Sequence, residues 1–288
     1  MAQLNRTIPA VRARPIRWQR WPGQILLTLG ALLFITPVIL MGLTALKPDA
    51  EIVHFRSVIP ENATLKNFTE ILGSAEEIPI FRWLANSILI STSVATLVVT
   101  VSALAAYAFA RLDPPGKRWV YPLIIGTLMV PGQVLLVPVY LILNRLGWLD
   151  TPFALIIPAG GGAFGLFMLH QFFLGIPAEL EEAAELDGCT RMGTFLNVVL
   201  PLSRPALAAL AIFTFVGSWN DFLGPLVFLD SVERYTLPVG VALFQSSYAT
   251  EYGLTLAAAV ICTLPAITAF LVFQRHIIQG IAVTGLKE

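Results

Sequence analysis

The chain has 288 residues, of which 56% are hydrophobic and 12% are charged, and its mean hydropathy is +0.76. This composition excludes an ordinary water-soluble domain, because charged residues make up about 25% of such domains. The formal net charge is zero and no charged tail is present, so nothing indicates nucleic acid as a partner. Two cysteines, Cys189 and Cys262, are too few for a disulfide framework.

Apolar stretches long enough to cross a bilayer recur along most of the chain. A spanning helix needs about 20 such residues, and a helix satisfies its own backbone hydrogen bonds in lipid. The predicted spans are 24–46, 83–110, 119–143, 152–173, 205–229 and 252–273. The sequence therefore predicts an all-α, polytopic membrane helical bundle with six transmembrane helices.

Two of these spans contain residues that disturb helices. The third contains Pro122, Pro131 and Pro138, which should kink or interrupt it. The fourth contains three glycines at 160–162, which either allow close helix contact or break the helix in mid-membrane. The first span resembles a signal peptide in position, but its apolar stretch is long and no small-residue cleavage site follows, so we predict an anchor.

Lysine and arginine residues predict the orientation, because they concentrate on the cytoplasmic side. One side of the predicted spans carries Arg6, Arg12, Arg14, Arg17, Arg20, Arg111, Lys117, Arg118, Arg191, Arg204, Arg275 and Lys287. The other side carries Lys47, Arg56, Lys66, Arg82, Arg145 and Arg234. Both termini are therefore predicted to be cytoplasmic, whereas segments 47–82, 144–151 and 230–251 face outward.

The resulting organisation has five parts. They are a cytoplasmic N-terminal segment 1–23, a first transmembrane helix 24–46, a periplasmic segment 47–82, a core of five helices 83–274, and a cytoplasmic tail 275–288. The outward segments 47–82 and 230–251 are either caps and docking elements or solvated linkers.

The cytoplasmic loop 175–203 is predicted to form two short helices. Pro177 suits a first helical position, Gly188 suits a turn that needs a positive φ, and Thr190 suits the N-cap of a second helix. In the second helix an apolar stripe needs a protein surface to cover it, and Pro201 ends the helix. The stripe consists of Met192, Phe195, Leu196 and Val199. Spacing alone also allows a solvated acidic helix followed by a helix on the membrane surface.

The motif Glu182-Ala-Ala-x-x-Asp-Gly188, followed by Leu200-Pro201-Leu202, closely resembles the EAA loop of the membrane subunits of binding-protein-dependent ABC importers. The resemblance implies that the loop is a coupling helix that docks in a groove of a cytoplasmic ATPase. Ala183 and Ala184 would then permit close approach, Gly188 would set the turn, and Glu182 and Asp187 would make polar or capping contacts.

Further segments resemble the carbohydrate-uptake branch of this family, close to the maltose-permease G-type subunit. They include Trp83-Leu-Ala-Asn-Ser87, Trp219-Asn-Asp-Phe-Leu-Gly-Pro-Leu226 and Gln274-Arg-His-Ile-Ile-Gln-Gly280. Two departures are His170, where relatives often have Arg, and the ending Lys287-Glu288, where Lys-Gly is commoner.

The resemblance implies a type I ABC importer transmembrane fold and alternating access in the bacterial-type inner membrane. The implied partners are a second homologous permease subunit, a dimer of ATPase subunits that holds ATP and magnesium, and an extracytoplasmic solute-binding protein that delivers a sugar.

The chain carries no motif for chemistry of its own. A phosphate loop is absent, because Arg111 occupies the required glycine position before Gly116-Lys117. His54, His170 and His276 lie far apart in the sequence, so neither a metal site nor a catalytic relay is predicted. We therefore predict no catalytic residue and no bound cofactor.

Asp221 is the one acid predicted within a span, where a carboxylate usually faces the bundle interior or water. Together with Trp219 and Asn220 it suits a sugar, because a ring can stack on the sugar and oxygens can accept its hydroxyls. Alternatively, Asn220 and Asp221 satisfy helix backbone near Pro225. A secondary transporter or channel is the competing class, but it needs more intramembrane ion ligands than Asp221 and a pair of inverted broken spans.

Overall fold

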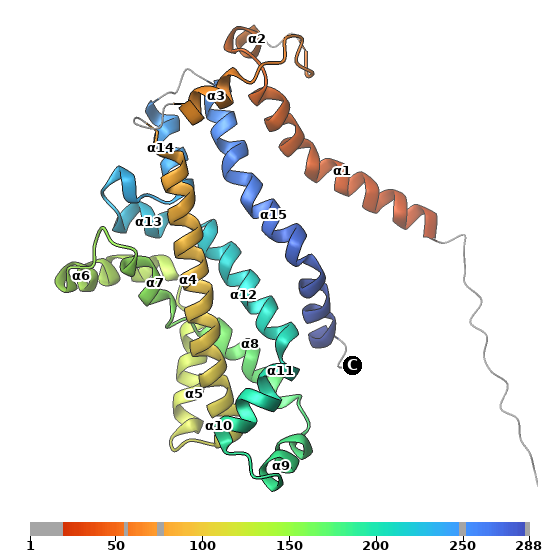
Figure 1. Cartoon of the computed structure of the whole chain (residues 1–288), viewed down its shortest axis with the longest axis vertical. Coiled ribbons are helices and arrows are strands. Elements are labelled where there is room, and N and C mark those ends of the chain that lie inside the picture. The colour runs from red at the N-terminus through yellow and green to blue at the C-terminus, as the bar shows by residue number, and fades with distance from the viewer. Residues whose placement is uncertain (1–19, 55–56, 74–77, 248–251, 286–288) are drawn as a thin grey trace, which may run out of the picture.

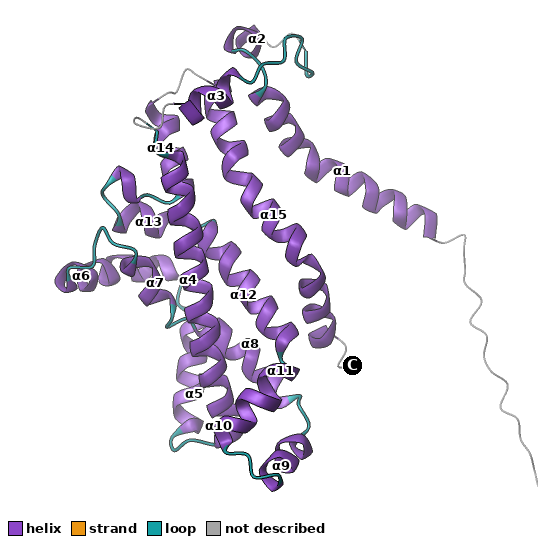
Figure 2. Ribbon diagram, in the orientation of Figure 1, coloured by secondary structure: helices purple, strands orange, loops and turns teal. Residues whose placement is uncertain are grey.

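The computed structural model describes residues 20–54, 57–73, 78–247 and 252–285, and every regular element within these ranges is a helix (Figure 2). The long helices are α1 (Arg20–Ala45), α4 (Ile80–Tyr107), α12 (Arg204–Trp219) and α15 (Tyr252–Gly285). The shorter ones are α2 (Asp49–His54), α3 (Lys66–Gly73), α5 (Lys117–Gly126), α6 (Leu136–Leu146), α7 (Phe153–Ala159), α8 (Ala163–Leu174), α9 (Ala178–Leu186), α10 (Arg191–Thr194), α11 (Leu200–Leu202), α13 (Leu223–Phe228) and α14 (Leu237–Ser247). Single π or 3-10 turns are η1 (Ala108–Leu112), η2 (Thr127–Met129), η3 (Gly132–Leu135), η4 (Phe195–Val199) and η5 (Val232–Arg234). The all-α prediction is confirmed.

Several of these helices are long and apolar enough to cross a membrane. Three pass on their own, namely Gly23–Ala45, Ile80–Leu112 and Phe153–Leu174, and two bent pairs raise the number to as many as five. The apolar part of α15, Tyr252–Thr268, is shorter. Most of the predicted N-terminal segment lies outside the described residues, as do Lys287 and Glu288, whereas α15 continues through most of the predicted tail.

The third predicted span is interrupted at Pro131, as the sequence predicted. Val130 and Pro131 are extended, with ψ of 117° and 129°, and the helices on either side meet at 97°. Proline has no N–H for the helix ladder and disfavours helical backbone at the residue before it, so the helix ends here. Pro138 lies in the first turn of α6, where a missing N–H has no intrahelical partner to lose.

Glycines in the fourth span both break the helix and allow close contact. The helix stops between α7 and α8, where Gly162 is extended with ψ of 126°. Gly165 then brings α8 against α4, because a Cβ at this position would lie 2.3 Å from Ser102 Oγ. Among the three predicted glycines, Gly162 lies at the break and Gly160 lies close to α4, because a Cβ there would be 3.0 Å from Leu97 Cδ2.

The fifth span is not the continuous helix predicted for 205–229. Helix α12 ends at Trp219, residues 220–222 are not helical, and α13 begins at Leu223. Asp221 therefore lies in a break rather than within a helix, and its Oδ1 accepts a hydrogen bond from Gly224 N at 3.3 Å. Short polar side chains compete with the helix backbone in this way, and Pro225 lies directly downstream.

Helix α4 forms the centre of the bundle and packs against α7, α8, α12 and α14. Helix α1 is different, because it runs beside α15 at the edge of the bundle and none of its apolar window is buried within the chain (Figure 1). Helices α9 and α10 lie at one end of the bundle, and α2, α3 and α14 lie at the other (Figure 1).

Candidate functional site

The loop 175–203 folds into the two predicted helical pieces. Helix α9 is followed by Gly188 with φ of +87°, and Thr190 Oγ1 accepts a hydrogen bond from Gly193 N at 3.1 Å to start α10. Both predictions are confirmed. Pro177 is placed one position earlier than predicted, because its ψ of 132° makes it the N-cap of α9 rather than the first helical residue.

The residues of the motif face different surroundings. Glu182, Ala183 and Asp187 are exposed near the tip of the loop, whereas Ala184 is buried against the rest of the chain. Leu186, the last residue of α9, is 89% exposed beside them. Pro201 is exposed at the far end of the loop, where the chain bends by 76° between Arg191–Leu202 and α12. The tip is therefore the part that offers both acidic and apolar groups.

The apolar stripe of the second helix is only half available to a partner. Phe195 and Val199 are 3% and 0% exposed and pack in a cluster with Tyr107 and Phe173. Met192 and Leu196, by contrast, are 56% and 52% exposed. The chain itself thus covers one side of the stripe with α4 and α8, which the sequence did not indicate.

Arg111 is a residue of this region that the sequence marked only as a topology signal. Its Nε lies 2.7 Å from Glu181 Oε1 on α9, and the same guanidinium donates to the carbonyl oxygens of Phe173 and Ile176 at 2.7 and 2.5 Å. Both side chains are largely buried, at 16% and 13% exposure. No sequence spacing reports this contact, because the partners come from three separate elements.

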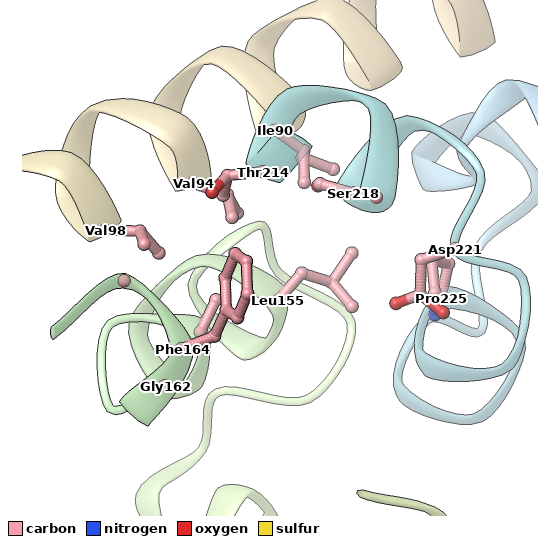
Figure 3. Close-up of a pocket in the computed structure, with 13 residues that line it drawn as sticks. Ile90, Val94, Val98, Leu155, Gly162, Phe164, Thr214, Ser218, Asp221 and Pro225 are labelled. Carbon is pink, nitrogen blue, oxygen red and sulfur yellow. The ribbon is translucent and has the colours of Figure 1, made fainter. Parts of the chain in front are cut away.

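A cavity of about 410 Å³ lies where α4, α7, α8, α12 and α13 meet (Figure 3). Its wall on α4 is apolar and consists of Ile90, Val94 and Val98. Polar groups also line the cavity: Thr214 and Ser218, four residues apart on α12, lie beside the α4 residues, and Asp221 follows in the break after α12 (Figure 3).

The structure brings Asp221, but neither Trp219 nor Asn220, to this cavity. Trp219 is 1% exposed and packs nearly parallel to Phe215, with the ring centroids 5.9 Å apart. Asn220 is exposed next to the C-terminal end of α12. Asp221 accepts a backbone hydrogen bond at the break, as the second interpretation predicts, and its side chain also lines the cavity (Figure 3).

The segment between α1 and α4 is held by a buried ion pair. Lys47 Nζ lies 3.6 Å from Glu51 Oε1, and both side chains are below 10% exposure. The backbone N–H of Glu61 donates to Glu51 and is the main reason that the pKa of this carboxyl lies below its usual value. Asn67 Nδ2 bridges the carbonyl oxygens of Ala45 and Lys47, so α3 is fastened to the end of α1.

No group of three or more potential metal ligands occurs among the described residues. His170 is buried and its Nδ1 lies 3.0 Å from Tyr121 Oη, while His54 is on α2 at the other end of the bundle. The side chain of His276 lies outside the described part of the chain.

Comparisons with known proteins place the chain among membrane permeases. Residues 98–283 match the family model described as binding-protein-dependent transport system inner membrane component. An arabinooligosaccharides transport system permease of Halalkalibacterium halodurans is 35% identical over 91% of this chain and 96% of its own length. The trehalose/maltose transport system permease of Thermococcus litoralis is 33% identical over 92% of this chain and 97% of its own length. A diacetylchitobiose uptake system permease of Streptomyces coelicolor is 32% identical over 89% of this chain and 85% of its own length.

The fold is also that of a solved transporter. A chain in the crystal structure of a bacterial ABC transporter that imports the acidic polysaccharide alginate aligns with a TM-score of 0.77 and 23% identity. The alignment covers 93% of this chain and 99% of that one, which confirms the predicted type I importer fold. The chain therefore belongs to the family of binding-protein-dependent transport system inner membrane components, and it is an inner-membrane permease of the ABC transporter class.

Proposed function

We propose that this permease imports a sugar or oligosaccharide that a solute-binding protein delivers, and that separate subunits hydrolyse the ATP. Three relatives that each match at least 89% of the chain are named for transport of arabinooligosaccharides, trehalose or maltose, and diacetylchitobiose. Saccharides are the class that these names share. The chain itself carries no phosphate loop, so ATP and magnesium belong to a dimer of partner ATPases.

The proposed topology has six crossings with both termini in the cytoplasm. The crossings are α1, α4, the bent pair α5 and α6, the pair α7 and α8, α12, and α15. Twelve of the 18 Lys and Arg residues fall on the side that holds the loop 175–203, which supports placing that loop in the cytoplasm. Helices α2, α3 and α14 then face outward, toward the binding protein.

The loop supports docking to an ATPase through its exposed tip. Glu182, Ala183 and Asp187 offer a small acidic face, and Leu186 adds a protruding apolar side chain. Gly188 holds the turn in a backbone conformation that side chains other than glycine disfavour. The single observation that carries the proposal is this fixed and exposed tip on a chain of the permease family.

The cavity supports a sugar path that is completed by a second, homologous permease subunit. Hydroxyls of Thr214 and Ser218 can donate and accept, and the Asp221 carboxylate can accept, which matches a sugar's hydroxyl groups. The apolar α4 wall suits the less polar face of a pyranose ring. Trp219 does not line the path but packs α12 into the core. Asn220 is exposed next to the path.

Closure of the ATPases on ATP would move the loop 175–203 and turn the cavity from one side of the membrane to the other. Gly188→Asp and Glu182→Lys should therefore abolish stimulation of the ATPase in the reconstituted transporter, while insertion into the membrane remains normal. Arg118→Gln, an exposed charge removed from α5 outside the loop 175–203, is the control and should leave stimulation unchanged. Normal stimulation in both loop variants would contradict the proposal.

Direct uptake tests the path. Asp221→Asn should lower sugar uptake about tenfold, because a hydrogen bond to a charged group contributes about 1.5–3 kcal/mol. Ser218→Ala should have a smaller effect in the same direction. Unchanged uptake in both variants, in complexes that still assemble, would remove the cavity from the path.

A further inference from the structure

Arg111 joins three elements that the sequence separates widely. It lies in η1, directly after α4, and its guanidinium contacts Glu181 in the first turn of α9 and the carbonyl oxygens of Phe173 in α8 and Ile176 after it. Carbonyl oxygens at and beyond a helix end lack partners in the helix ladder, so a guanidinium with several donors is well suited to this place. One side chain thus joins the end of α4 to the connection between α8 and α9 and holds the start of the loop 175–203.

The burial of this contact distinguishes it from the other ion pairs nearby. Arg111 and Glu181 are 16% and 13% exposed, whereas Lys117 and Asp113, only a few residues on, are 33% and 83% exposed. Charges in the exposed pair remain hydrated and contribute little, but a largely buried carboxylate that loses its guanidinium is left uncompensated. The position of α9 therefore depends on Arg111.

The second half of the loop is attached to the same end of α4. Tyr107 Oη donates to the carbonyl oxygen of Arg191 at 3.2 Å, and the rings of Tyr107 and Phe195 lie 4.8 Å apart. Arg111 and Tyr107 are four residues apart and hold α9 and α10 respectively. Both arms of the loop are thus fixed to consecutive turns of one segment.

Helix α4 connects this attachment to the cavity. It continues without a break from Ile80 to Tyr107, and three of its side chains, Ile90, Val94 and Val98, form the apolar wall of the cavity. We propose that Arg111 is a positioning residue that locks α9 onto the end of α4, so that the loop and the cavity wall move as one body. The proposal rests on the proposed function in one respect, namely that the partner ATPases act on this loop.

A distance measurement tests the lock without any partner. Spin labels are placed at Leu186→Cys on α9 and Leu104→Cys on α4, both exposed positions, after Cys189 and Cys262 are replaced by serine and alanine. The full chain in detergent should give a narrow distance distribution. Arg111→Gln and Glu181→Gln should each broaden it at least twofold, and Lys117→Gln should not change it. An unchanged width in both variants overturns the proposal.

The complete transporter tests the role in coupling. With the second permease, the ATPases and the binding protein present, we expect Arg111→Gln and Glu181→Gln to lower the number of sugars imported per ATP at least fivefold, with ATP hydrolysis retained. Lys117→Gln should keep the parent ratio. A normal ratio in variants whose distances have broadened overturns the positioning role. A parent complex that imports no sugar contradicts the proposed function instead, and the label distances still decide whether the lock exists.

Discussion

The two ends of α4 are attached to the rest of the molecule in different ways. At the Trp83 end, the buried contacts are neutral, because Trp83 Nε1 donates to Val232 O at 2.7 Å and Ser87 Oγ accepts from Leu237 N at 2.7 Å. The ion pair of Arg82 with Glu233 at this end is exposed. At the Arg111 end, a largely buried ion pair joins α4 to the loop 175–203 and holds α9, beside the contacts of Tyr107 with α10 and η4.

Because of this difference, we expect the two ends of α4 to contribute to different properties, namely the folding stability of the chain and the coupling of sugar import to ATP hydrolysis. A closely packed neutral contact contributes to folding and tolerates little change in volume. A contact between a loop and a single charged side chain can be lost while the surrounding core stays packed. We therefore expect substitutions at the Trp83 end to lower the stability of the chain, and those at the Arg111 end to lower the coupling ratio.

Among the stability variants, Gly240→Ala is expected to lower the melting temperature most. A Cβ at this position would lie 2.2 Å from Trp83 Cδ2, and Trp83 is 4% exposed, so its ring has little room to move. Overpacking costs about 1–3 kcal/mol and occasionally more, and three Trp83 ring atoms within 2.7 Å of the new Cβ place this variant at or above the upper end, so the melting temperature in detergent should fall by several degrees. Gly42→Ala, where nothing lies within 4 Å, is the control and should leave the melting temperature the same or slightly higher. An unaltered melting temperature for Gly240→Ala would remove the distinction between the two ends.

A smaller effect is expected for Ser87→Ala. Its hydroxyl accepts the first N–H of α14, and Leu237 is 0% exposed, so the variant leaves a buried donor without a partner at a cost of about 1–3 kcal/mol. Ser91→Ala is a matched control on the same helix. Ser91 is also 1% exposed, but its hydroxyl has no hydrogen-bond partner in the described part of the chain, so its removal should be neutral or stabilising. Equal losses of thermal stability in the two variants would disprove the role assigned to Ser87.

The smallest effect concerns pH and Asp150, which fixes the segment that Trp83 contacts. Burial opposes ionisation, but hydrogen bonds from Ser231 and Asp230 and the charge of Arg234 outweigh it, so the pKa of Asp150 lies below its usual value. Because the pKa is lower in the folded state, the stabilisation is present above the unfolded-state value and is lost as the pH falls through the folded-state value. Melting temperatures should therefore fall on acidification, and less steeply in Asp150→Asn. Asparagine also tolerates the positive φ of 55° at this residue. Parallel pH profiles for parent and variant would contradict this assignment.

The sequence predicted most of the local structure of the coupling loop. Gly188 indicates a turn because few other residues adopt a positive φ, and Thr190 indicates a helix start because few residues are good N-caps. Both preferences depend only on residues nearby in the sequence. Pro131 interrupts its span for the same local reason. The prediction of a continuous fifth helix was wrong. The apolar sequence continues through α13, so hydrophobicity alone does not reveal that the helix is interrupted where Asp221 accepts a hydrogen bond from Gly224 N.

The contacts between residues far apart in the chain could not be predicted from the sequence. Trp219 was read as part of the sugar path, but α12 turns its ring into the core beside Phe215. Arg111 was read as a topology signal, and only the fold brings it to Glu181 on α9. Which face of a long apolar helix is buried depends on its neighbours, and a nearly uniform hydrophobic sequence does not specify them.

The sequence by itself determined that this protein lies in a membrane, that it is helical, and where the loop 175–203 turns, because composition and local backbone preferences suffice for these properties. Only the tertiary structure decided that Asp221 reaches a cavity while Trp219 does not, and that α4 joins the cavity wall to the loop 175–203. Those facts depend on contacts between residues far apart in the chain, such as Arg111 with Glu181, which pattern and spacing do not encode.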